Sequence, residues 1–392
     1  MTMLMKILFV HPYNIEYPGG AEKWIVEVSK RLKVKGHKIA IAFASWPCNS
    51  QSTITNNFTI LARNRITLYK CSYIKLPRGY PIIDPKCILQ IVSDYDIIYV
   101  YASPPNELFL YLSKTINKRL YEKPIIAVFH SMLEPHRSLL HKLYIPLFVA
   151  IYNKFDKLHV LNGYMYKLFT KYYNMPDKKV VFIPNGVDTS IFRFEKHLVN
   201  RSPSKYFEIL FVSRFIRNKG VITFHKVVET LNEKYPSISK DILFKIAGVG
   251  PLKCYIDDLV TRYNNVIYLG FLEKRNLAEE YLRSHMLILT SFIENMPLTL
   301  LEASACGLPA VASAIPGVID VIETVNYGIL VKPGNIEGFV RGIVQLYNAW
   351  KSSPEHYFNI RKRISERTAV NYDWNIIINR IERMFLEALN MR

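Results

Sequence analysis

The feature that most constrains this chain is a succession of short, continuously apolar runs that alternate with amphipathic segments. Runs rich in β-branched residues, such as KILFV (6–10) and DIIYVY (96–101), are typical of strands buried on both faces. Segments with helical periodicity, such as 20–34, lie between them. Strands separated by helices form parallel sheets that are covered on both sides. The sequence therefore predicts an α/β protein built on parallel sheets.

This alternation occurs twice, which predicts two doubly wound domains in the 392 residues. We place the domains at 1–190 and 205–371, with the weakly patterned segment 189–207 as the linker. Ligands of such sheets bind beyond the carboxyl ends of the strands, so we expect a binding cleft between the two domains. The strands predicted for the two domains are 6–10, 37–43, 96–101, 124–130, 157–162 and 179–185, followed by 208–213, 242–248, 265–271, 286–291, 309–313 and 328–333.

Positive charge is concentrated in the first half of the chain. Residues 1–194 carry 26 Lys and Arg against 12 Asp and Glu, whereas residues 195–392 carry 25 against 20, and the whole chain has a formal net charge of +19. A basic half favours acidic partners, namely phosphate-bearing molecules, an anionic membrane face or nucleic acid, although a merely basic surface would look the same. We find no interleaved aromatic motif or helix-turn-helix motif, so we expect no nucleic-acid partner.

Neither a membrane span nor a secreted protein is predicted. No apolar run reaches the roughly 18–20 residues that a spanning helix requires, and the N-terminus has no cleavage-site pattern. The cysteines Cys48, Cys71, Cys87, Cys254 and Cys306 are far apart and form no C-x-x-C pair. This spacing predicts neither a disulfide framework nor a zinc site and favours a reducing, cytoplasmic environment.

Three turns that follow predicted strands are candidates for ligand binding. Gly19 and Gly20 precede a helix whose N-terminus could face an anion, although a tight strand–helix connection would need the same glycines. Arg214 and Lys219 come directly after strand 208–213, where a guanidinium and an ammonium suit a diphosphate, and ordinary loop charges are the alternative. The glycine-rich turn 246–251 could line a flat base or a ribose.

The stretch SFIENMPLTLLEASACG (291–307) contains two carboxylates, Glu294 and Glu302, among apolar residues. We predict that Pro297 is the first residue of a helix capped near 295–296, and that Gly307 ends it. Glu294 then lies in the preceding loop and Glu302 in the second turn. A phosphate could bind the free helix amides between them, while the carboxylates accept hydrogen bonds from hydroxyl-rich ligands. Alternatively, Glu294 only caps the helix and Glu302 is an ordinary half-exposed residue.

The two glutamates and several motifs in order resemble the retaining glycosyltransferases of the GT-B fold, glycosyltransferase family 4 especially. The E-x7-E spacing is accompanied by P-G-G-A-E near the start, I-P-N-G-V-D (183–188), S-R-F-x-x-x-K-G (213–220), A-G-x-G-P (247–251) and G-I-L-V-K-P-G-N (328–335). The resemblance covers most of the chain. It implies two Rossmann-like domains facing a central cleft, with the last helix, 372–389, crossing back to the first domain.

The resemblance also implies roles for individual residues. Arg214 and Lys219, with the turn at Gly19 and Gly20, would hold the donor diphosphate. Glu294 would hold the hydroxyls of the donor sugar, Glu302 the nucleotide ribose, and Gly248 and Gly250 would border the base. His130 would face the donor sugar, with His136 as a less favoured substitute. Many members have glycine where this chain has Pro297, which lacks an N–H, so the amides of Leu298 and Thr299 must serve the phosphate.

The expected activity is transfer of a hexose from a nucleotide diphosphate donor, with retention, to a lipid-linked, glycan or small-molecule acceptor. A GT-B-fold epimerase and a non-catalytic nucleotide-sugar-binding protein are the alternatives. We expect no metal or other cofactor, because Asp94-Tyr95-Asp96, which imitates a D-x-D site, introduces a strand at the end away from the ligand. The basic first domain suits a location in the cytoplasm at the inner face of a membrane, against anionic lipid or a phosphate-linked acceptor.

Overall fold

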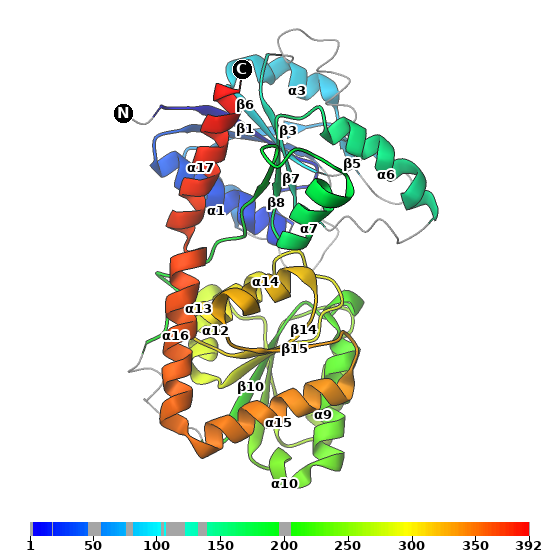
Figure 1. Cartoon of the computed structure of the whole chain (residues 1–392), viewed down its shortest axis with the longest axis vertical. Coiled ribbons are helices and arrows are strands. Elements are labelled where there is room, and N and C mark those ends of the chain that lie inside the picture. Colours follow the sequence, from blue (N-terminus) through cyan, green and yellow to red (C-terminus); the bar gives the residue numbers. More distant parts are fainter. Residues whose placement is uncertain are drawn as a thin grey trace. The chain divides into compact units, whose positions relative to one another are not determined.

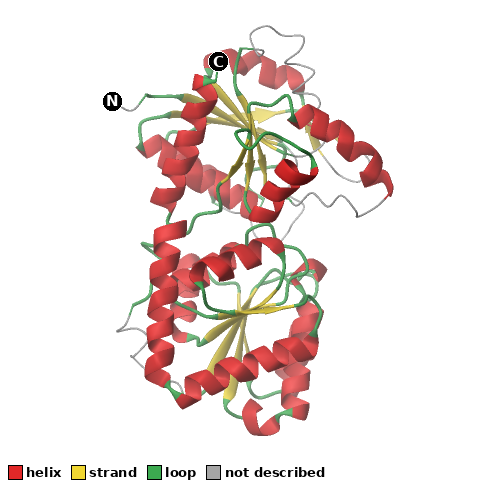
Figure 2. Ribbon diagram, viewed as in Figure 1, coloured by secondary structure: helices red, strands yellow, loops and turns green. Residues whose placement is uncertain are grey.

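The structure is a computed structural model that divides into two compact units. It describes residues 3–17, 19–45, 56–75, 81–102, 106, 122–131, 139–195 and 205–391, with only the backbone described in 139–145. One unit comprises Met1–Pro184 and Ile377–Arg392, and the other comprises Asn185–Ile376. Each unit contains a parallel sheet with helices on both faces (Figure 1; Figure 2). The predicted α/β class with two doubly wound sheets is confirmed.

The described part of the first unit contains a seven-stranded parallel sheet with the order β3-β2-β1-β6-β7-β8-β9, and an antiparallel pair of β4 and β5. The strands are β1 (Lys6–His11), β2 (Lys38–Ala44), β3 (Thr67–Cys71), β4 (Tyr73–Lys75), β5 (Pro81–Ile83), β6 (Ile97–Tyr101), β7 (Ile125–Phe129), β8 (Lys157–Val160) and β9 (Val180–Phe182). The helices are α1 (Gly20–Val34), α2 (Asn57–Arg63), α3 (Pro85–Ile91), η1 (Val92–Asp94), α6 (Leu139–Tyr152), α7 (Gly163–Lys167) and the π-helix η2 (Leu168–Tyr172).

The second unit contains a six-stranded parallel sheet with the order β12-β11-β10-β13-β14-β15. The strands are β10 (Phe207–Val212), β11 (Ile242–Ala247), β12 (Val266–Gly270), β13 (Met286–Leu289), β14 (Ala310–Ser313) and β15 (Ile329–Val331). The helices are η3 (Arg217–Lys219), α9 (Val221–Lys234), α10 (Pro236–Ser239), α11 (Lys253–Arg262), α12 (Lys274–Arg283), α13 (Leu298–Ala305), α14 (Pro316–Val325), α15 (Ile336–Ser352) and α16 (Pro354–Tyr372). The last helix, α17 (Trp374–Asn390), begins in this unit and continues into the first from Ile377.

Strand order determines where each sheet can bind a ligand. In both sheets the chain starts at a central strand, proceeds outward in one direction, and then returns to the other side of that strand. The reversal falls between β1 and β6 in the first unit and between β10 and β13 in the second. Side chains beyond the carboxyl ends of these four strands therefore lie at the topological switch points, where doubly wound proteins bind ligands.

Helices α1 and α17 cover one face of the first sheet through aromatic packing. Tyr99, on β6, stacks on Trp24 of α1 with 5.7 Å between ring centroids, and it also contacts Phe385 of α17 at 5.4 Å. The buried ring of His37 donates from Nε2 to Glu382 Oε1 at 2.8 Å, because its Nδ1 accepts a hydrogen bond from the amide of Met5. The final helix is thus tied to the first sheet through both apolar and polar contacts.

Sequence reasoning located the buried central strands but missed β3, β4 and β5. Strand β3 lies at an edge of its sheet, and within it only Cys71 is fully buried. A strand with one paired neighbour and little burial needs no continuous apolar run, so its sequence carries a weak signal. The unit boundary lies at Asn185, four residues before the expected linker at 189–207.

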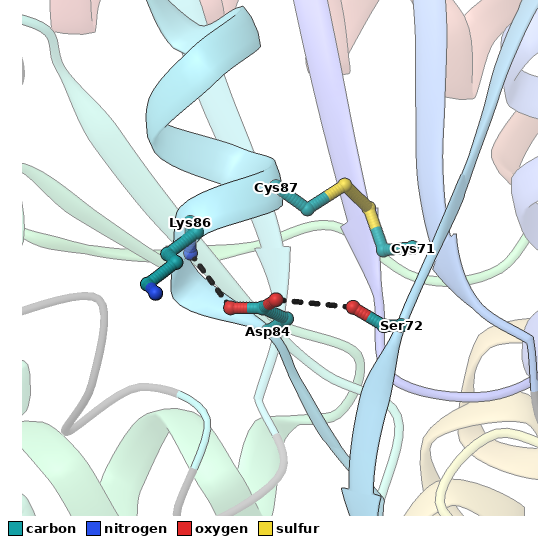
Figure 3. The surroundings of a disulfide bond; sticks show 5 residues. All are labelled: Cys71, Ser72, Asp84, Lys86 and Cys87. Carbon is teal, nitrogen blue, oxygen red and sulfur yellow. Dashed lines mark hydrogen bonds between the residues drawn. A yellow bond between two sulfur atoms is a disulfide. The ribbon is translucent and has the colours of Figure 1, made fainter.

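Cysteine spacing gave a wrong prediction, because Cys71 and Cys87 form a disulfide (Figure 3). Cys71 ends β3, Cys87 lies in α3, and their Cα atoms are 5.9 Å apart. Asp84 caps α3 by accepting a hydrogen bond from the Lys86 amide at 2.9 Å, and it also accepts one from the Ser72 hydroxyl at 3.0 Å. The antiparallel strands β4 and β5 reverse the chain between Cys71 and Cys87, which brings together two cysteines that are 16 positions apart. Cys254 and Cys306 are free, and Cys48 lies outside the described residues.

The Asp94-Tyr95-Asp96 segment has a structural role in the sheet. The Asp96 carboxylate accepts a hydrogen bond from the Lys6 amide at 2.7 Å, which joins the entry of β6 to the entry of β1. This is the amino end of the strands, as the sequence predicted. Across the described parts of the chain, no group of three or more His, Cys, Asp and Glu side chains could hold a metal ion, and no helix is long and apolar enough to cross a membrane.

Candidate functional site

Two loops meet at the switch point of the second sheet. The loop after β10 carries Arg214 and Lys219, and the loop after β13 carries Glu294. The Phe292 amide donates to the Asn218 carbonyl at 2.8 Å, and the Thr290 hydroxyl donates to the Gly220 carbonyl at 2.9 Å. The two loops therefore form one hydrogen-bonded surface, although the bonded residues are 70 or more positions apart.

Gly220 allows this close approach. Its φ of +68° lies in the left-handed region, and a Cβ there would lie 1.9 Å from the Thr290 carbonyl oxygen. Both the backbone conformation and the lack of space require glycine. Gly220 is also the N-cap of α9, so it sets the direction of the chain directly after Lys219.

Lys219 and Glu294 form an ion pair at this surface. The Lys219 Nζ lies 2.5 Å from Glu294 Oε1, and the Ser291 hydroxyl donates to the same oxygen at 2.8 Å. The side chains of Lys219 and Glu294 are 23% and 10% exposed, so the pair is only partly solvated. The cost of partly burying the Glu294 carboxylate is thus offset by a cation and a hydroxyl.

Arg214 is exposed, and among the described residues no hydrogen bond or ion pair engages its guanidinium. It remains available for an anionic ligand, whereas Lys219 is already neutralised. The two basic residues predicted to bind a diphosphate together therefore differ: the charge of Arg214 is not paired with a carboxylate among the described residues, whereas that of Lys219 is paired with Glu294.

Helix α13 begins one residue later than predicted. Pro297 is its N-cap and not its first residue, with an extended conformation at φ −73° and ψ 117°. The expected cap near 295–296 was therefore wrong. The side chain of Pro297 has no acceptor, so the N-cap residue makes no capping hydrogen bond to the first amides of the helix, which include those of Leu298 and Thr299. A free helix N-terminus carries a partial positive charge that suits an anion.

The rest of the predicted helix geometry is confirmed. Gly307, with φ +75°, follows the last turn of α13, and its amide donates to the Ser304 carbonyl at 2.9 Å. Glu302 lies in the second turn and is half-buried. The buried Tyr281 of α12 donates from its hydroxyl to Glu302 Oε2 at 3.4 Å. Both glutamates thus have polar partners that their spacing alone did not indicate.

Gly248 and Gly250 lie against the loop that carries Arg214. Both have positive φ, and a Cβ on Gly248 would lie 1.8 Å from the Ser213 carbonyl oxygen. A Cβ on Gly250 would lie 2.7 Å from the Phe215 amide nitrogen. These glycines let the turn after β11 pack directly on the loop after β10. A border for a nucleotide base remains a proposal for this turn.

The turn at Gly19 and Gly20 follows the switch-point strand β1 of the first unit. Gly19 is the N-cap of α1, and a Cβ there would lie 2.0 Å from Glu22 Oε2. An added Cβ on Gly20 would meet no atom within 4 Å. A side chain at Gly19 would therefore displace the Glu22 carboxylate, whereas one at Gly20 would extend into open space.

A buried pair lies beneath this turn. His11, the last residue of β1, has its Nε2 2.9 Å from Glu22 Oε1, and both residues are at most 3% exposed. Glu22 ends the P-G-G-A-E motif, but no role was predicted for it or for His11. The available signal was a polar residue at the end of a buried strand, followed by an acidic residue in the first turn of the next helix.

His130 follows β7 at the carboxyl end of the same sheet. Its ring stacks on Tyr101 with 5.3 Å between centroids and meets Trp24 edge-on at 4.8 Å. Desolvation of the ring lowers the pKa of His130 well below its usual range, and the nearby His159 and His11 lower it further. His130 is therefore neutral at neutral pH and can act through hydrogen bonds but not as a cation. The alternative, His136, lies outside the described residues.

The chain matches two known protein families, which together span most of its length. Residues 18–191 match the family described as Glycosyltransferase Family 4, and residues 192–368 match that described as Glycosyl transferases group 1. The chain belongs to the family 4, group 1 glycosyltransferases. The family membership that the motifs implied is confirmed.

Individual relatives agree with this membership. The chain is 29% identical to a human phosphatidylinositol N-acetylglucosaminyltransferase subunit over 215 residues, 53% of this chain but only 40% of that protein. It is 23% identical to N-acetyl-alpha-D-glucosaminyl L-malate synthase of Bacillus anthracis over 392 residues, 95% of this chain and 96% of that one. The crystal structure of Anabaena HepE in complex with UDP has a TM-score of 0.75 at 17% identity and covers 98% of this chain and 100% of that one. This glycosyltransferase therefore has the GT-B fold.

Proposed function

We propose that this family 4 glycosyltransferase transfers a hexose from a nucleotide diphosphate sugar to an acceptor hydroxyl, with retention of configuration and without a metal ion. The observation that carries the proposal is the second-unit switch point, where Arg214, the Lys219–Glu294 pair and the uncapped N-terminus of α13 follow neighbouring strands. Cations and helix amides suit the diphosphate, and carboxylates suit sugar hydroxyls. HepE, similar in fold, binds UDP, which supports a nucleotide ligand.

In the proposed reaction the bond between the anomeric carbon and the β-phosphate oxygen breaks, and a bond from the acceptor oxygen to that carbon forms on the same face. The acceptor proton passes to the departing phosphate oxygen, so no protein nucleophile is needed. Arg214, Lys219 and the amides of Leu298 and Thr299 stabilise the charge that develops on the leaving diphosphate. Glu294 orients the sugar hydroxyls, and neutral His130 offers a hydrogen bond without adding charge.

The Lys219–Glu294 ion pair adds a step to donor binding. If Lys219 binds the diphosphate and Glu294 binds the sugar, the 2.5 Å contact between them must lengthen or be shared as the donor enters. The ion pair then keeps the Lys219 and Glu294 side chains ordered until the donor binds.

The acceptor is proposed to be phosphate-linked or lipid-linked. The basic composition of residues 1–194 suits an anionic acceptor or membrane face, and the similar human phosphatidylinositol N-acetylglucosaminyltransferase is named for a lipid acceptor. Co-sedimentation with phosphatidylglycerol vesicles at low salt tests this part. Absence of binding, compared with phosphatidylcholine vesicles as the control, would refute the membrane proposal.

A donor screen tests the chemistry. Calorimetry with UDP-, GDP- and ADP-sugars should identify one nucleotide that binds, and turnover of that donor should fall in Glu294→Ala and Arg214→Ala. Turnover equal to the parent protein in both variants would contradict the site. Donor epimerised or hydrolysed without any acceptor would favour the epimerase alternative, and binding without turnover would favour the non-catalytic one.

A further inference from the structure

Tyr281 is a buried polar residue next to one of the proposed ligand residues. It has no exposed surface, and its hydroxyl lies 3.4 Å from Glu302 Oε2. An ionised carboxylate only accepts hydrogen bonds, so the phenol is the donor. Burial raises the pKa of Tyr281 well above its usual range, and the charge of Glu302 raises it further, so the donor proton is retained.

The distance between Tyr281 and Glu302 is held by a third helix, α16. The buried Arg361 donates to the carbonyls of Leu282 at 3.0 Å and Gly307 at 3.3 Å, at the ends of α12 and α13. One turn later on α16, the Ser365 hydroxyl donates to the Ala305 carbonyl at 2.6 Å. The two helices that carry the Tyr281–Glu302 contact are therefore attached to one scaffold and not to mobile loops.

The 3.4 Å contact is long for a bond between a hydroxyl and a carboxylate. Such bonds in ligand-free sites commonly shorten when the ligand fixes the acceptor. A carboxylate already restrained through one oxygen loses less rotamer freedom when it binds a ligand hydroxyl. Tyr281 is thus suited to prepare Glu302 for a hydroxyl-bearing ligand without touching the ligand.

We propose that Tyr281 is a positioning residue that holds the Glu302 carboxylate for the ribose of a nucleoside diphosphate and so contributes to selection of ribose over deoxyribose. This inference rests on the proposed function, because it takes the ligand of Glu302 to be the ribose of the donor. It assigns Tyr281 no direct contact with the substrate.

The test uses Tyr281→Phe, which removes one hydroxyl and keeps the ring packing. Calorimetry measures the Kd of the nucleoside diphosphate that the parent protein binds, whether UDP, GDP or ADP, and of its 2′-deoxy and 3′-deoxy forms. We expect the ribonucleotide to bind about three- to tenfold more weakly to the variant, the effect of one hydrogen bond. The analogue that lacks the hydroxyl bound by Glu302 should bind both proteins equally. In a Glu302→Gln background, Tyr281→Phe should have a smaller effect on ribose preference, since paired residues couple.

The matched control is Tyr357→Phe. Tyr357 is another buried tyrosine of the second unit, and its hydroxyl donates to the His285 backbone carbonyl at 2.9 Å. It should lower thermal stability and leave ribose preference unchanged. An unchanged ribonucleotide Kd in Tyr281→Phe, or equal weakening of ribo and deoxy forms, would overturn the inference while leaving the proposed function intact. Failure of the parent protein to bind any nucleotide would overturn both.

Discussion

Replacing Glu294 with glutamine should tighten the binding of a free nucleoside diphosphate. In the ligand-free protein Lys219 is held by Glu294 at 2.5 Å, so the diphosphate must compete with a carboxylate for this cation. Glutamine has nearly the same shape and keeps an oxygen that can accept from Ser291, but it carries no charge. The substitution therefore removes the competitor and its repulsion of phosphate while it preserves the loop.

The magnitude follows from the exposure of the pair. With side chains 23% and 10% exposed, the ion pair lies between a surface pair, worth about 0–1 kcal/mol, and a hydrogen bond to a buried charge, worth about 1.5–3 kcal/mol. We take about 1 kcal/mol, which corresponds to about fivefold in Kd. Turnover of the sugar donor should fall by about tenfold or more, because the lost charge normally holds sugar hydroxyls in the transition state.

Calorimetry of UDP, GDP and ADP with the parent and Glu294→Gln proteins measures the first effect, and steady-state turnover measures the second. The control is Glu229→Gln, which removes an ion pair with Arg262 on the helical surface of the same unit and should change neither quantity. Weaker or equal binding of the nucleoside diphosphate by Glu294→Gln would refute the idea that Glu294 competes for Lys219. Unchanged turnover would refute its role toward the sugar.

Three further predictions concern stability. Replacing Cys71 and Cys87 with serine should lower the free energy of unfolding of the first unit by about 3 kcal/mol, because the disulfide closes a loop of 16 positions. The midpoint of thermal denaturation should fall in this double variant but not in the control Cys254→Ser, which changes an exposed free cysteine. Equal midpoints for the double variant and the parent protein would argue against the disulfide. Gly220→Ala should destabilise the second unit by about 2 kcal/mol or more through its positive φ and the contact with the Thr290 carbonyl; a loss below about 0.5 kcal/mol in urea unfolding would contradict this. Burial lowers the pKa of His159 to about 4, below about 6.5 in the unfolded chain. Between pH 6.5 and pH 4 the unfolded chain binds a proton at His159 that the folded protein does not bind. The free energy of unfolding is therefore unaffected by this residue above pH 6.5 and falls by about 3 kcal/mol as the pH approaches 4. His159→Gln should flatten the acid dependence of urea unfolding followed by tryptophan fluorescence, and an unchanged slope would contradict this prediction.

Features that depend on a few neighbouring residues were readable before the structure was known. The apolar runs identified the central strands because most positions of a strand buried on both faces are apolar. Pro297 and Gly307 bracketed α13 to within one residue, because proline and glycine restrict the backbone locally. The same local rules placed Glu294 in the loop and Glu302 in the second turn.

Contacts between distant segments could not be read in this way. The Lys219–Glu294 pair joins residues 75 positions apart, and it exists because β10 and β13 are neighbours in the sheet. The Cys71–Cys87 disulfide likewise depends on the turn through β4 and β5. Sequence periodicity reports whether a side chain faces apolar surroundings, but the partner that meets it depends on strand order and on how closely loops can approach. In this glycosyltransferase, residue types and their local spacing sufficed for the kind of fold and the candidate ligand residues, whereas long-range packing determined the polar partner of each carboxylate, the Lys219 ammonium for Glu294 and the Tyr281 hydroxyl for Glu302.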